Sequence, residues 1–351
     1  MLDYLIVGLG LAGVSFCECL ESKGKTFRVI NDNSQTSSIV AAGLYNPVIL
    51  KRFTLAWNAE KQINLVHPFY AALEKKLGVT LDHKLPLLRR FSSAEEQNNW
   101  FRAADTARLQ NFLSDEVTAN NYAKLDAPFG FGEVIGTGRI ATGELIKHYS
   151  EYLNANGRIL QETFIGTRLK IEKNCVIYNS LKAKRIIFAE GFGLSKNSLF
   201  DYLPLTGTKG ELLKIKAPNL KVDKIIKSAI FLIPLGRDFY RVGATYKWKD
   251  KTNIPTAEAK SELLEKLRAF VKADFTVEEH VAGIRPTVTD RRPLVGRHPI
   301  YSNLYVLNGM GSRGVMIAPY ASRQLFNLIE YDKPLDPELN IARFSAKYNP
   351  K

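Results

Sequence analysis

The sequence predicts an α/β protein with two parts. One is a discontinuous domain whose parallel strands alternate with helices, and the other is an inserted α+β domain built on an antiparallel sheet. A buried strand runs into a glycine-rich turn and a helix within residues 4–24, and similar buried strands recur near residues 185 and 304. Residues 203–245, which lie between them, hold consecutive strand patterns without a helix, as is typical of antiparallel sheets.

Domain boundaries are expected where these patterns change. The discontinuous domain then comprises residues 1–50, 140–204 and 285–351, and the inserted domain comprises residues 51–139 and 205–284. At 351 residues the chain is long enough for two domains that each bury a core.

The glycine-rich turn carries three glycines with separate expected roles. Gly8 permits the tight turn, Gly10 lets a pyrophosphate approach the backbone, and Gly13 lets the helix pack close to the strand. The helix that follows offers unpaired N–H groups and the positive end of its dipole to an anion. A second apolar strand over residues 27–30 completes the pattern. This context predicts a Rossmann-like dinucleotide-binding unit, although an ordinary glycine-rich turn is the alternative.

The end of the second strand is where a ribose contact is expected, and two residues compete for it. Asn31 occupies the position that ordinarily holds an acidic residue, and Asp32 follows it. An asparagine amide can both donate and accept hydrogen bonds, so a ribose contact by Asn31 is possible. The alternative is that residues 31–33 form only a polar turn.

The other expected elements follow from apolar spacing and turn residues. Apolar residues repeat at intervals of three and four over residues 59–77, which predicts an amphipathic helix that bends at Pro68 and ends at Gly78. Thr142 is expected to cap a later helix. Further helices are expected over residues 94–112, 142–157 and 263–270 and from Gly314 to 329. Further strands are expected over residues 85–91, 159–165, 176–180, 185–189, 210–215, 228–234, 239–244 and 304–307.

Composition narrows the class of protein. The chain is 45% hydrophobic and 24% charged, and no apolar run reaches the ~18 residues that span a bilayer. No signal peptide precedes the first strand, so we expect a cytoplasmic protein without stable membrane insertion. Its cysteines are Cys17, Cys19 and Cys175, which form no disulfide framework, and no His/Cys cluster has metal-ligand spacing. We therefore expect no metal site.

The net charge of +14 permits an anionic partner such as RNA or an acidic membrane surface. The basic residues are dispersed, however, and occur in pairs and not in a run of five or more. The pairs are Lys51-Arg52, Arg89-Arg90 and Arg291-Arg292. A solvated basic surface is therefore favoured over a dedicated nucleic-acid site.

Several further motifs accompany the glycine turn along nearly the whole chain. In order they are Ser37-Ser38, Ala41-Ala42-Gly43-Leu44, Phe164, Ala189-Glu190-Gly191, Gly243-Ala244-Thr245, Gly283-Ile284-Arg285-Pro286 and the glycine-rich segment from Gly309 to Pro319. This ordered set resembles the D-amino acid oxidase and glycine oxidase superfamily of FAD enzymes. The resemblance implies that the discontinuous domain binds FAD and that the inserted domain binds substrate.

The resemblance also implies a set of FAD contacts. They are Gly8, Gly10, Leu11, Ala12, Gly13, Asn31, Asp32, Ser37, Ser38, Ala42, Gly43, Leu44, Phe164, Ala189, Glu190, Gly191, Gly311, Ser312, Arg313, Gly314, Val315 and Met316. Some members of the superfamily attach the flavin to a cysteine near the C-terminal flavin loop. Because this chain has no cysteine there, we expect noncovalent FAD.

By the same resemblance, the enzyme oxidises the C–N bond of a small amino acid or secondary amine by hydride transfer to the flavin. Arginine suits a substrate carboxylate because its planar fork can bind both oxygens. Arg285 is the first candidate, Arg313 the second, and Tyr246 adds a phenolic hydrogen bond. The alternative for Arg285 is an ordinary salt bridge with Asp290. Lys209 lies either near the flavin or, as is favoured, in solvent.

Other functions stay open. Residues 43–47, 243–246, 311–314 and 333–336 resemble the oxidase domain of bifunctional enzymes that trim carboxymethyl groups on a tRNA wobble uridine. Binding of tRNA is therefore a second hypothesis, less favoured than a small-molecule substrate. A quinone-linked amino acid dehydrogenase, a protein that holds FAD without turnover and an NAD-dependent enzyme are the remaining alternatives. The oligomeric state and the electron acceptor stay open.

Overall fold

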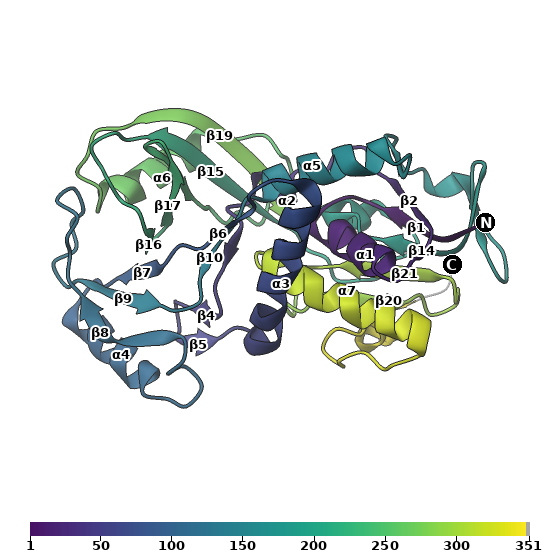
Figure 1. Ribbon diagram of the computed structural model, residues 1–351, viewed down its shortest axis with the longest axis horizontal. Coiled ribbons are helices and arrows are strands. Elements are labelled where there is room, and N and C mark those ends of the chain that lie inside the picture. Colours follow the sequence, from purple (N-terminus) through teal and green to yellow (C-terminus); the bar gives the residue numbers. More distant parts are fainter. Residues whose placement is uncertain (349–351) are drawn as a thin grey trace.

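The computed structural model describes residues 1–348, and within them two eight-stranded sheets dominate the architecture. Figure 1 shows β1 (Leu2–Val7) and β14 (Leu181–Phe188) in one lobe, and β7 (Leu87–Arg90) and β9 (Phe131–Val134) in the other. Helix α3 (Ala59–Leu77) lies between the two lobes in this view. This arrangement confirms the predicted fold class.

The first sheet is built on parallel strands in the order β11–β2–β1–β14–β21. Residues 4–7 of β1 are almost fully buried, which explains their continuous apolar run. The carboxyl ends of parallel strands meet at one edge, where α/β folds bind their ligands. The remaining bounds are β2 (Phe27–Ile30), β11 (Ile159–Leu160), β12 (Leu169–Ile171), β13 (Val176–Tyr178), β20 (Leu294–Arg297) and β21 (Leu304–Asn308).

Three helices pack on this sheet and on one another through one core. They are α1 (Leu11–Glu21), α5 (Thr142–Ala155) and α7 (Gly314–Tyr331). The α1 helix follows the glycine turn as predicted, and Gly24 adopts a positive φ of 63° just beyond its end. Helix α5 begins at Thr142 itself, and Ala141 precedes it without a side-chain cap, so the expected cap at Thr142 is wrong.

The second sheet runs in the order β19–β15–β18–β17–β16–β7–β9–β8. Neighbours are antiparallel as predicted, except that β16 and β7 pair in parallel. Helix α6 (Ala257–Arg268) covers one face and shares its core through Leu263 and Leu267. The remaining bounds are β8 (Leu113–Thr118), β15 (Thr208–Lys216), β16 (Ile225–Lys227), β17 (Phe231–Gly236), β18 (Phe239–Gly243) and β19 (Thr276–Arg285).

Helix α3 has the predicted form but packs on the parallel sheet's side. It contains Pro68 and ends at Gly78, whose φ of 69° is left-handed. Its buried residues share the core of α1 and α7, and the Tyr70 hydroxyl donates a hydrogen bond to the carbonyl of Val315 at 3.0 Å. The predicted boundaries assign this helix to the inserted domain. Sequence periodicity identifies an apolar helix face but does not show which sheet that face packs against. The domain boundaries stay a prediction.

Shorter elements complete the chain. The expected helix over residues 94–112 is shorter, since α4 spans Ala94–Ala104. The others are α2 (Ser37–Val40), β3 (Leu44–Tyr45), β4 (Val48–Ile49), β5 (Thr54–Leu55), β6 (Asp82–His83), β10 (Gly138–Ile140), η1 (Gly166–Arg168), η2 (Gly191–Lys196) and η3 (Ile341–Lys347). Within residues 1–348, no helix combines the length and apolar character needed to cross a bilayer.

Candidate active site

A cavity of about 1660 Å³ extends from the carboxyl ends of the parallel strands to the inner face of the second sheet. Its lining includes nearly every residue expected from the sequence to contact the cofactor, together with Arg285 and Tyr246. Gly13 and Met316 are the expected contacts that lie outside the lining. The structure therefore brings together residues that lie at opposite ends of the chain, from Val7 to Val315.

The glycine turn has the predicted close packing. Gly8 has a φ of +98°, and a Cβ there would lie 2.5 Å from the carbonyl oxygen of Ala189. A Cβ on Gly13 would lie 2.2 Å from the carbonyl oxygen of Gly8, so this glycine serves helix packing and not ligand contact. A Cβ on Gly10 would point at the Ser38 hydroxyl, 3.0 Å away. The backbone is thus left open to a ligand at the start of α1, as a pyrophosphate requires.

The serine segment faces this same turn. The N–H of Leu11 donates a hydrogen bond to the Ser38 hydroxyl at 3.2 Å, which places Ser38 at the first turn of α1. Gly43, farther along the segment, has a φ of +75°, and a Cβ there would lie 1.9 Å from the carbonyl oxygen of Ile140. The chain can pass β10 at that point only with glycine. Ala42 and Leu44, on either side of it, line the cavity.

Asn31 and Asp32 lie at the predicted place, but their polar atoms are used within the chain. The Asn31 side-chain carbonyl accepts a hydrogen bond from the N–H of Leu9 at 3.1 Å, and its amide donates to the Asn33 side chain at 2.7 Å. One Asp32 carboxylate oxygen accepts from the N–H of Ser34 at 2.9 Å. Both residues therefore shape the turn.

Phe164 and Glu190 reach the same end of the cavity from two other strands. The Phe164 ring stacks on Tyr178 with centroids 4.9 Å apart, which fixes the segment after β11. Glu190 follows β14 and accepts a hydrogen bond from the Asn197 amide at 2.8 Å. Burial raises the pKa of the Glu190 carboxyl to about 7, Asn197 opposes this, and the charge of Asp32 adds to it.

The C-terminal glycine loop lies over the cavity at the start of α7. The N–H of Gly311 donates to the carbonyl of Pro286 at 3.1 Å, which joins this loop to the end of β19. Gly314 and Val315, in the first turn of α7, line the cavity. The N–H of Met316 instead donates to the carbonyl of Arg313 at 3.0 Å, and its side chain is buried in the core. Met316 thus lies outside the cavity lining, because successive residues of a helix point in different directions, and its contact with FAD stays a prediction.

Arg285 enters the cavity from the end of β19. Its guanidinium donates to the carbonyl of Thr245 at 3.3 Å and lies 4.4 Å from the centre of the Tyr246 ring. A Cβ on Gly210, on the neighbouring strand β15, would lie 2.0–2.3 Å from the guanidinium atoms, so this glycine makes room for Arg285. Burial lowers the pKa of Arg285. The expected alternative of a salt bridge with Asp290 is wrong, because Asp290 pairs with Arg343 at 2.8 Å.

Arg313 approaches the same region from the N-terminus of α7. It donates to the carbonyl of Asn46 at 2.6 Å and to that of Val48 at 3.4 Å, and burial lowers its pKa. Among residues 1–348, neither Arg313 nor Arg285 has a carboxylate within 4.0 Å. The cavity therefore holds two guanidinium groups without an anionic partner among the residues that the structure describes.

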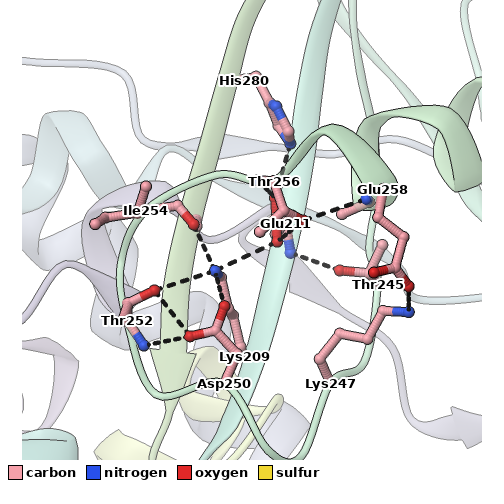
Figure 2. A network of polar contacts seen from close by, with 12 residues as sticks. Lys209, Glu211, Thr245, Lys247, Asp250, Thr252, Ile254, Thr256, Glu258 and His280 are labelled. Carbon is pink, nitrogen blue, oxygen red and sulfur yellow. Dashed lines mark hydrogen bonds and ion pairs between the residues drawn. The ribbon is translucent and has the colours of Figure 1, made fainter.

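Lys209 lies neither at the cavity nor in solvent, so both expectations for it are wrong. It is fully buried, and it lies on the opposite face of β15 because it alternates along that strand with Gly210 and Leu212, which line the cavity. Figure 2 shows the contacts of its ammonium. Its ammonium bonds to Asp250 at 2.5 Å, to Thr252 at 3.3 Å and to the carbonyl of Ile254, and it lies 3.5 Å from Glu211. A buried charge needs such partners, and apart from Glu211 they lie more than 40 positions away in sequence. The network holds the segment that follows Tyr246, over residues 247–256.

Sequence reasoning missed Lys227, which also lines the cavity. Burial lowers the pKa of its ammonium to about 8, and the charges of Arg89 and Lys266 lower it further. Its position at the end of the short strand β16 was the available signal, but that strand was itself missed.

Comparison with known proteins agrees with this geometry. The family model described as DAO, FAD dependent oxidoreductase, matches residues 3–328. A bifunctional protein of Nitrosospira multiformis, MnmC, named for tRNA 5-methylaminomethyl-2-thiouridine biosynthesis, is 24% identical over 90% of this chain and 55% of its own length. The chain spans about half the length, or less, of the first curated relatives that it matches.

Solved structures show the same fold. A glycine oxidase from Bacillus cereus superposes with a TM-score of 0.78 over 95% of this chain and 96% of that chain, at 20% identity. An iminodiacetate oxidase from a Chelativorans species gives a TM-score of 0.78 with the same coverage, at 19% identity. The cofactor is FAD, and the turn at Gly8, the open α1 terminus and the cavity suit its dinucleotide. The chain belongs to the DAO family of FAD-dependent oxidoreductases.

Proposed function

We propose that this enzyme oxidises the C–N bond of a small amine that carries a carboxylate, such as an amino acid or a secondary amino acid. The observation that carries the proposal is the pair of guanidinium groups, Arg285 and Arg313, that line the cavity without a carboxylate partner among residues 1–348. Two partly desolvated cations in one cavity favour an anionic ligand, because its charge offsets their cost of burial.

Arg285 is the principal carboxylate contact. One N–H group of its guanidinium donates to the carbonyl of Thr245, so other N–H groups stay available to a ligand. Arg313 donates one hydrogen bond to the carbonyl of Asn46 and a longer one to that of Val48, so it holds the loop in place and adds its charge to the cavity. The Tyr246 ring covers Arg285 at 4.4 Å and presents its phenol beside the ligand.

FAD, when bound, would supply the acceptor for the hydride that leaves the carbon next to the nitrogen. The chain's part is to position that carbon and to keep the amine neutral. Two guanidinium charges disfavour a second cation nearby, so they lower the pKa of a bound amine. The first turn of α7 directs its dipole and the N–H groups of Gly314 and Val315 toward the cavity, which favours negative charge there. No side chain needs to act as a general base in this scheme.

The direct test is anaerobic addition of glycine, sarcosine, iminodiacetate and D-amino acids to the purified holoprotein. Bleaching of the flavin absorbance by any of them supports the proposal. The same amine added to Arg285→Lys should bleach the flavin only at a higher concentration. Hydrogen peroxide formed in air would identify oxygen as acceptor, whereas turnover only with an added quinone would identify a dehydrogenase. A flavoprotein that no amine reduces contradicts the proposal.

A second candidate is oxidation of a modified nucleotide in tRNA. The segment after Tyr246 presents Trp248, 52% exposed, and Tyr246 itself, 58% exposed, beside the basic residue Lys249. Exposed aromatic rings next to lysines are suited to stacking of unpaired bases. Binding of tRNA should then weaken steeply with salt and fall on Trp248→Ala. Tyr331→Ala is the control, because Tyr331 is also exposed, at 54%, but is the last residue of α7 and not part of the segment after Tyr246.

A further inference from the structure

The dinucleotide fold requires a hydrogen-bond acceptor for the adenosine ribose at the end of the second strand. That acceptor is ordinarily a carboxylate about 20 residues after the glycines. Asn31 occupies this position here. Its side-chain carbonyl accepts a hydrogen bond from the N–H of Leu9, and its side-chain NH₂ donates one to the side chain of Asn33. Asn31 therefore braces the glycine turn and offers little to a ribose.

A carboxylate reaches the same place from another strand. Glu190 follows β14, which lies beside β1 in the sheet, and a Cβ on Gly8 would come within 3.1 Å of the Glu190 Cα. On its other side, the side chain of Gln35 lies 3.9–4.0 Å from the Cβ position of Gly191. Glu190 thus sits between the glycine turn and the segment that follows β2, and it lines the cavity there.

One carboxylate oxygen of Glu190 is available to accept a further hydrogen bond. The Asn197 amide donates to one carboxylate oxygen at 2.8 Å, and among residues 1–348 no hydrogen bond reaches the other oxygen. Burial and the charge of Asp32 raise the pKa of Glu190 to about 7, although Asn197 opposes the rise. Such a rise is expected for a carboxylate that lacks a second donor. A ribose hydroxyl would supply that donor.

We propose that Glu190 accepts the hydrogen bond from the adenosine ribose of FAD, in place of the usual residue at the end of the second strand. Asp32 and Glu162 also line the cavity, as does Lys196 on the segment that follows Glu190. The inference concerns the cofactor alone and does not depend on which amine is oxidised.

The test uses the full chain, freed of flavin, with ADP, 2′-deoxy-ADP and 3′-deoxy-ADP as competitors of FAD binding followed by flavin fluorescence. In the wild type, the weaker deoxy analogue should bind about tenfold less tightly than ADP, because a charge-assisted hydrogen bond is lost. In Glu190→Gln this ratio should fall to about two or less. In Asp32→Asn, the matched control, it should stay near the wild-type value. Because the ratio is taken within one variant, a change in overall stability does not alter it.

FAD affinity supplies a second readout. The Kd for FAD should rise about tenfold in Glu190→Gln and less than about threefold in Asp32→Asn. A wild type that does not distinguish ADP from its deoxy analogues overturns the inference. The inference is also overturned if Glu190→Gln keeps the wild-type ratio between the Kd values of the deoxy analogue and ADP. It is overturned as well if Asp32→Asn loses both this ratio and its affinity for FAD.

Discussion

Replacement of Gly210 by alanine should weaken substrate binding without touching the substrate, by displacing Arg285. Gly210 lies on β15, directly beside the end of β19 that carries Arg285. Its φ is not in the left-handed region, so alanine adopts the same backbone without strain. The substitution therefore acts through one contact.

The size of the effect follows from the geometry. The new Cβ would lie 2.0 Å from Nη2 of Arg285, whereas ordinary contacts begin at 3.4 Å, so the guanidinium must retreat by about 1.4 Å, the difference between these distances. A hydrogen bond does not survive a shift of that size. Hydrogen bonds to charged groups contribute about 1.5–3 kcal/mol, so the affinity for a carboxylate should fall roughly 10- to 150-fold.

The assay is titration of the holoprotein with acetate or glycine, followed through the perturbation of the flavin's visible spectrum. The Kd of the ligand should rise in Gly210→Ala, and the flavin content should stay at the wild-type level. The control is a double-mutant cycle with Arg285→Ala, since removal of the side chain leaves the new methyl group nothing to displace.

Two results would refute this reasoning. Gly210→Ala with wild-type affinity would show that Arg285 does not bind the carboxylate from its present position. An equal loss from Gly210→Ala in the Arg285→Ala background would show that the alanine acts through another contact.

Three further outcomes are expected. Lys209→Met should lower the free energy of unfolding by about 3–5 kcal/mol, seen as a lower Tm, because the buried Glu211 then loses its ammonium partner and depends on His280, whose pKa is lowered by burial; an unchanged Tm would contradict this. Lys209 also holds the pKa of Asp250 at about 2, below its unfolded value of about 3.9, so this pair stabilises the fold above pH ~4 and the contribution is lost as pH falls toward 2. The slope of Tm against pH in that window should be shallower in Lys209→Met. Gly13→Ala should reduce FAD content, since its Cβ would meet the Gly8 carbonyl at 2.2 Å and push α1 from the turn; wild-type flavin content would rule this out.

Local patterns predicted the nucleotide-binding part well. The strand, turn and helix at residues 2–21 depend on contacts close in sequence, and the roles of Gly8 and Gly13 follow from the shape of one turn. The strand Phe27–Ile30 appears with the expected bounds, since its apolar run is flanked by polar residues. Such elements are fixed by neighbours within about 30 residues.

Long-range packing accounts for most of the differences. The local sequence predicts that Lys209 lies at the surface, because Asp250 and Ile254, the partners that allow its burial, lie more than 40 positions away. The partner of Asp290 proved to be Arg343, at the far end of the chain, and not the nearby Arg285. Charged residues within β19 likewise hid a ten-residue strand whose pairing with β15 positions the site. No local pattern contains this information.

The measurement that tests the central claim most directly is the anaerobic rate of flavin reduction by amines in matched pairs, one member with a carboxylate and one without. Glycine is paired with methylamine, and sarcosine with dimethylamine. If Arg285 and Arg313 select a carboxylated amine, at least one amino acid reduces the flavin while its partner does not. Equal rates within each pair, or reduction only by tRNA, would contradict the account.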